Sequence, residues 1–80
     1  MKKEHANLIL PDTNVLIGDV ESINKFINDG NLVVIALTVL QELDRLKSDW
    51  RIGAQVRCIT RQIEDLVFSG SSQLIIERKM

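Results

Sequence analysis

The chain has 80 residues, 45% of them hydrophobic, a net charge of −1 and one cysteine. A single cysteine excludes an internal disulfide and a cysteine-built metal site, and no run approaches the roughly 18 apolar residues of a membrane span. Pro11 and Asp12 interrupt the apolar stretch that follows the basic start, so no signal peptide is expected. The composition predicts a cytoplasmic protein without a membrane partner and without a global nucleic-acid footprint. Locally, residues 44–61 hold five basic and two acidic side chains.

Two apolar runs and one amphipathic segment are predicted in the first half of the chain. Residues 8–10 and 32–37 are apolar without alternation, which is typical of strands buried on both faces of a parallel sheet. Between them, residues 20–27 place apolar side chains on one face of a helix. Asp19 is its expected N-cap, and Gly30 stands where a helix stop belongs.

A helix followed by a loop is predicted after the second apolar run. Thr38 and Gln41 match a capping box. The helix that they open has an apolar stripe of Val39, Leu43 and Leu46. Residues 47–53 are polar and read as a loop, in which Trp50 is expected to cover a core edge in preference to stacking on a base.

The longest predicted helix covers about residues 53–68, and residues 74–76 are a candidate third strand. Its core face consists of Val56, Ile59, Ile63, Leu66 and Val67. Arg57 and Arg61 lie on the opposite face, where ion pairs with Glu64 and Asp65 are favoured over RNA contact. The order strand, helix, strand, two helices, strand predicts an α/β fold, a small three-layer parallel sheet with flanking helices.

Two carboxylates are expected at one edge of this sheet. Asp12 follows the first strand, and Glu42 is placed in the first turn of the helix after the second strand. Ligands of open parallel sheets collect beyond the carboxyl ends of the strands. Neighbouring carboxylates repel unless a cation lies between them, and Mg²⁺ or Mn²⁺ prefers such oxygen ligands. Such an ion polarises a phosphodiester and lowers the pKa of a bound water.

A simpler explanation exists for both carboxylates. An aspartate after a strand is commonly a turn or cap residue, and a glutamate in a first helical turn answers the helix dipole. From spacing alone, this explanation is favoured over a metal site.

Three strings of the sequence resemble motifs of the PIN-domain ribonuclease family. They are LPDTNVLI at residues 10–17, VLQELDRLK at residues 39–47 and GAQVR at residues 53–57. The third is similar to an element of PIN domains joined to phosphate-starvation-inducible (PhoH-type) ATPases. The resemblance spans about residues 7–77.

The resemblance implies a five-stranded parallel sheet with a central first strand, and divalent-metal endoribonuclease activity on single-stranded RNA. Mg²⁺ or Mn²⁺ is the implied cofactor. By position in the motifs, Asp12 and Glu42 are implied as catalytic metal ligands. Thr13 and Asn14 are implied to orient Asp12 or to contact substrate, and Arg57 to contact a phosphate.

The match departs from the family pattern at its end. The remaining acidic residues of the family come from later strands, and nothing follows Met80. Residues 1–80 are therefore predicted to be the truncated N-terminal portion of a PIN-like domain, weak or inactive alone. The alternative is a catalytically incomplete fragment that serves as an oligomerisation or interaction module. A homodimer or higher oligomer is expected, formed through the bare edge of the first strand or by packing of exposed helical faces. An ATPase or an antitoxin is a candidate partner.

Overall fold

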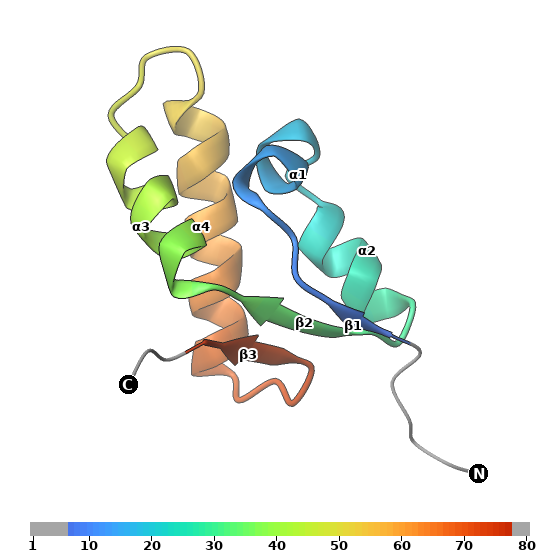
Figure 1. Cartoon of the computed structure of the whole chain (residues 1–80). Helices are drawn as coiled ribbons and strands as arrows, with labels where there is room; N and C mark the ends of the chain where they lie inside the picture. The colour runs from blue at the N-terminus through green and yellow to red at the C-terminus, as the bar shows by residue number, and fades with distance from the viewer. Residues whose placement is uncertain (1–6, 78–80) are drawn as a thin grey trace, which may run out of the picture.

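The computed structural model describes residues 7–77, in which helices pack on a parallel sheet (Figure 1). In chain order the elements are β1 (Leu8–Ile9), α1 (Thr13–Gly18), α2 (Ser22–Asn28), β2 (Leu32–Ile35), α3 (Leu37–Leu46), α4 (Gly53–Phe68) and β3 (Leu74–Ile76). The predicted α/β fold with flanking helices is confirmed, with α1 as an additional short helix. Among residues 7–77, no helix is long and apolar enough to cross a membrane.

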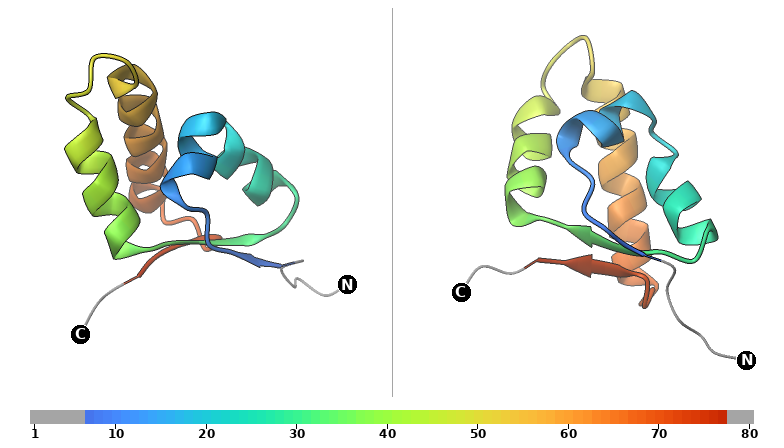
Figure 2. Two further views of the ribbon diagram at one scale, coloured as in Figure 1. Left: turned by 45° about the horizontal axis from the view of Figure 1, so that its top comes forward. Right: turned by 45° about the vertical axis from the view of Figure 1, so that its right-hand side comes forward.

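The sheet has three parallel strands in the order β1-β2-β3. The helices of both crossovers lie on the same side of it, as the left view of Figure 2 shows most clearly. Right-handed crossovers between strands that follow one another in order require this placement. The described residues therefore form a sheet and one layer of helices. The third layer of the expected three-layer arrangement has no counterpart among residues 7–77.

Burial along the strands follows from this one-sided cover. In β2, Val33 and Ile35 are fully buried while their neighbours are only partly buried. Leu8 of β1 is 59% exposed. The expectation of strands buried on both faces is therefore wrong for β1 and β2, because helices cover only one face of the described sheet.

All of the helices contribute to a single core above the sheet. Its buried members are Leu16, Ile23, Val33, Ile35, Val39, Leu43, Val56, Ile59, Ile63 and Leu74. The predicted core faces of α3 and α4 are confirmed by these residues, with one exception. Val67 is 53% exposed, whereas Leu66 beside it is partly buried against the core.

The predicted helix starts are wrong in two places. α3 begins at Leu37 with Ala36 as its N-cap and no side-chain cap bond, so Thr38 lies inside the first turn and forms no capping box. α2 begins at Ser22, two residues later than expected. Asp19 instead accepts hydrogen bonds from the Glu21 amide at 3.0 Å and from the Lys25 ammonium at 2.7 Å. The Lys25 hydrogen bond, followed by that of the amide, lowers the pKa of Asp19.

Gly53 lies where the backbones of α3 and α4 approach each other closely. A Cβ added there would stand 2.7 Å from the Lys47 carbonyl oxygen and 3.1 Å from Arg57 Nη1. The same Arg57 nitrogen donates to the Lys47 carbonyl at 3.1 Å. Residues 53–57 therefore hold the start of α4 against the end of α3, through the close approach at Gly53 and the Arg57 hydrogen bond.

Replacing Gly53 by alanine is expected to lower the free energy of unfolding by about 1–3 kcal/mol, because a backbone carbonyl must shift to admit the methyl group. Urea denaturation measures the change. Gly18→Ala is the matched control, since a Cβ at Gly18 meets nothing within 4 Å. Equal stability of the two variants would contradict the close approach at Gly53.

Candidate active site

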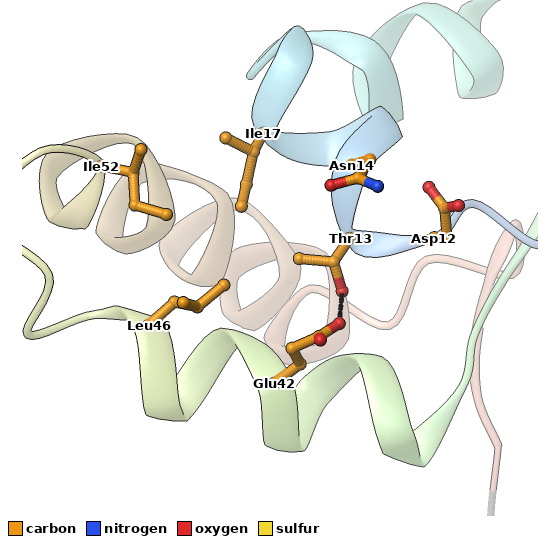
Figure 3. A pocket seen from close by; sticks show the side chains of 7 residues that line it. All are labelled: Asp12, Thr13, Asn14, Ile17, Glu42, Leu46 and Ile52. Carbon is orange, nitrogen blue, oxygen red and sulfur yellow. Dashed lines mark hydrogen bonds between the residues drawn. The ribbon is translucent and has the colours of Figure 1, made fainter.

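A pocket opens between the start of α1 and the middle of α3 (Figure 3). Its volume is about 410 Å³, and its lining consists of Asp12, Thr13, Asn14, Ile17, Glu42, Leu46 and Ile52. Figure 3 shows the polar side chains gathered at one end and Ile52 and Leu46 toward the other. Four residues that the sequence marked as functional therefore come together in one pocket.

The ends of β1 and β2 set the positions of the two carboxylates. Asp12 follows β1 as the N-cap of α1, and its Oδ1 accepts the Val15 amide at 2.9 Å. Asp12 is thus a helix cap, as the simpler explanation from sequence had it, and the cap hydrogen bond occupies one of its two carboxylate oxygens. Glu42 lies in the second turn of α3, not in the first as expected, because the helix begins at Leu37. Glu42 therefore does not serve the N-terminal dipole of α3.

Thr13 connects the two helices at the pocket. Its side chain is 7% exposed, and its hydroxyl donates to Glu42 Oε1. The other oxygen of Glu42, Oε2, lies 3.4 Å from Arg45 Nη2. Thr13 therefore fixes Glu42 from α1, whereas the resemblance had implied Asp12 or substrate as its partner. Within residues 7–77, Asp12 Oδ2 makes no hydrogen bond, and Asp12 lines the pocket beside Thr13 and Asn14.

Arg57 does not line this pocket. One of its guanidinium nitrogens is held by the Lys47 carbonyl, 3.1 Å away. Within residues 7–77, no ion pair joins Arg57 or Arg61 to Glu64 or Asp65, the alternative favoured from sequence. Contact of Arg57 with a phosphate stays a prediction.

Sequence reasoning missed the apolar wall of the pocket and the cation beside Glu42. Ile17 stands four residues after Thr13, and Leu46 four residues after Glu42, so each shares a helix face with a polar pocket residue. Arg45 pairs with Glu42 at the i,i+3 spacing. This spacing was visible in the sequence for α3. It was not visible for α1, because that helix was not expected.

The oxygen ligands that line the pocket suit a hard divalent cation, but they are few. Among residues 7–77, no group of three or more His, Cys, Asp or Glu side chains is placed to hold a metal. Mg²⁺, however, usually binds through one or two carboxylates and keeps several waters. Asp12 and Glu42 supply two such exposed carboxylates in a pocket with room for hydrated ligands, so the residues present fit a weakly held, partly hydrated ion.

Asp12 and Glu42 line one pocket beyond two neighbouring parallel strands, the edge at which α/β sheets bind their ligands. A sequence model of the PIN domain matches residues 9–80, and the chain belongs to the PIN-domain family. This is a nuclease-type family that typically uses Mg²⁺ or Mn²⁺. No curated protein and no solved structure matches the chain.

Proposed function

We propose that this PIN domain is a divalent-metal-dependent endoribonuclease acting on single-stranded RNA, with Asp12 and Glu42 as its metal ligands. The observation that carries the proposal is that both carboxylates line one pocket beyond β1 and β2. A bound Mg²⁺ or Mn²⁺ supplies Lewis-acid stabilisation of the charge that develops on a phosphodiester.

The chain's own residues prepare the site for such an ion. The Val15 amide fixes Asp12 through Oδ1 and leaves Oδ2 for a ligand. The Thr13 hydroxyl fixes Glu42 from a buried position, which limits the rotamers of a long side chain. Asn14 is exposed at the same rim and offers an amide to a phosphate or ribose. Leu46 and Ile52 form the apolar end of the pocket, away from Asp12.

Addition of Mn²⁺ is expected to broaden the amide resonances of Asp12, Thr13, Asn14 and Glu42. The expected dissociation constant is on the order of millimolar, because among residues 7–77 only two carboxylates line the pocket. A two-dimensional NMR titration measures it. Asp29, an exposed aspartate at the end of α2, is the internal control and keeps its signal. Broadening that spares the pocket amides would contradict the metal assignment.

Three finer proposals accompany the nuclease. Relationship to PIN domains joined to PhoH-type ATPases rests on residues 53–57, where Gly53 and Arg57 also have the packing roles described above. An ATPase or an antitoxin is the proposed partner class. A cytoplasmic location is proposed from the composition alone.

An interaction module is the second candidate function, and it is favoured by the exposed edge of β1. Within residues 7–77, β1 pairs with β2 only, so its other side presents unpaired backbone groups. Leu8 in β1 and Leu10 just after it are 59% and 56% exposed. Unpaired edges with apolar side chains favour pairing with another chain.

We expect the chain to form a homodimer through this edge, and Leu8→Lys to shift it toward monomer, because a charge on an edge strand opposes pairing. Sedimentation equilibrium over a hundredfold concentration range measures the effect. Ile75→Lys is the matched control on the opposite edge strand, where the side chain is 46% exposed. A wild-type chain that stays monomeric throughout would contradict the interaction module.

A further inference from the structure

Trp50 is an exposed aromatic residue that takes no part in the core formed by residues 7–77. Its side chain is 90% exposed, so the expectation that it covers a core edge is wrong. A single exposed apolar residue is ordinary on a protein surface. Three features of its surroundings give this one a specific meaning: a braced loop, the adjoining pocket and a local excess of positive charge.

Hydrogen bonds brace the loop of residues 47–52 on both sides of Trp50. The Asp49 amide donates to the Leu46 carbonyl at 2.9 Å, and the Asp49 carboxylate accepts the Arg51 amide at 2.8 Å. Gly53 donates back to the Asp49 carbonyl at 2.6 Å. Arg57 holds the Lys47 carbonyl. The indole is therefore presented to solvent by a fixed backbone, which limits the entropy lost when a ligand stacks on it.

The loop is continuous with the apolar end of the acidic pocket. Leu46 precedes the loop, Ile52 ends it, and both line the pocket. The Cα atom of Trp50 lies within about 7.6 Å of that of Ile52, because two trans peptide links separate them. Figure 3 shows Ile52 and Leu46 at the end of the pocket away from Asp12. A chain that crosses the pocket from Asp12 toward Ile52 therefore reaches the loop that carries Trp50.

The charge around this loop suits a polyanion. Residues 44–61 contain five basic and two acidic side chains, although the whole chain has a net charge of −1. Arg51, next to Trp50, has a side chain 68% exposed while it pairs with Asp49. Arg45 is equally exposed beside Glu42. Basic groups next to an exposed aromatic ring are the usual components of a single-strand nucleic-acid surface.

We propose that Trp50 is the stacking platform for an unpaired nucleobase of the RNA strand, on the side of the acidic pocket away from Asp12. The inference rests on the proposed function for its choice of RNA. The indole accepts any base, because every base has a π-face, while the basic side chains of the loop follow the phosphates. Bases inside a duplex are already stacked on their neighbours, so the platform selects single-stranded RNA.

Trp50 is the only tryptophan of the chain, so its emission reports on this site alone. In EDTA, which prevents metal binding and cleavage, titration with an oligouridylate is expected to quench the emission. An abasic ribose-phosphate strand of the same length is expected to bind about 10-fold more weakly and without quenching. Trp50→Leu is expected to weaken oligouridylate binding by about 10-fold, as measured by anisotropy of a labelled strand, and Trp50→Phe by less.

Phe68→Leu is the matched control, because Phe68 is an aromatic residue 96% exposed at the other end of α4. This variant keeps wild-type binding. Equal binding of the abasic strand, or wild-type affinity of Trp50→Leu, would overturn the platform. So would emission that responds to protein concentration and not to RNA, which would indicate a second copy of the chain as the partner. If the chain binds no Mn²⁺ but oligouridylate still quenches the Trp50 emission, the nuclease proposal fails and the stacking role of Trp50 is retained.

Discussion

Replacement of Leu16 by alanine is expected to lower the free energy of unfolding by about 2–5 kcal/mol, through lost burial and the cavity left behind. Leu16 is fully buried and packs α1 into the core shared with α3 and α4. The stability expected for a domain of 80 residues is about 4–12 kcal/mol in total. The variant is thus expected to lose a large part of its stability, which urea denaturation measures.

Val15→Ala is the matched control for this experiment. Val15 precedes Leu16 in α1 but is 44% exposed, and alanine keeps the backbone amide that caps onto Asp12. We expect a change within about 0.5 kcal/mol. Since α1 carries Thr13 and Asn14 into the pocket, Leu16→Ala is also expected to weaken Mn²⁺ binding. Equal destabilisation by both substitutions would show that α1 is not held by the core.

The longer helices of this fold were predictable because each contains enough turns to show a repeating pattern of apolar residues. α4 was predicted over about residues 53–68 and is observed at Gly53–Phe68. The stripe of Val39 and Leu43 in α3 was likewise correct. The order of strands and helices, together with the crossover rule, then predicted a parallel sheet.

α1 was not predictable by the same means. It has six residues, includes β-branched Thr13 and Val15, and ends in Gly18. Such a segment has weak intrinsic helix propensity and is too short to show a helical period. It forms because Asp12 caps it and Leu16 is buried beneath it, and the second of these contacts depends on elements distant in sequence.

The candidate site was predictable to the same extent as the elements that carry it. The placement of Asp12 and Glu42 at one pocket followed from the carboxyl ends of parallel strands. The hydrogen bond from Thr13 to Glu42 could not be predicted, because the direction of the Thr13 side chain depends on α1 being a helix, and that helix was not expected from the sequence. Trp50 was misplaced because a single loop residue has no periodic partner from which burial can be predicted.

Asp12→Asn is expected to abolish Mn²⁺ broadening in the pocket and to slow cleavage of single-stranded RNA by at least about 100-fold, since metal-ion stabilisation is worth several kcal/mol. Asparagine caps helices as well as aspartate does, so the substitution removes a charge while the Val15 hydrogen bond is kept. Asp12→Ala loses the cap as well and is expected to cost about 1 kcal/mol of stability, which Asp12→Asn does not. Comparing the two variants separates the cap role of Asp12 from its ligand role.

Asp44→Asn provides the matched control on α3, two residues beyond Glu42. Asp44 is exposed and pairs with Lys47 at 2.8 Å, away from the residues that line the pocket. Mn²⁺ binding is the primary readout, because two carboxylates hold a divalent ion weakly and slow turnover is then expected. An equal loss of Mn²⁺ binding in Asp44→Asn would show that the loss in Asp12→Asn comes from the change in surface charge and not from a lost metal ligand. Unchanged Mn²⁺ binding in Asp12→Asn would leave Asp12 as a helix cap only, and the Thr13–Glu42 hydrogen bond as a contact between helices without a catalytic purpose.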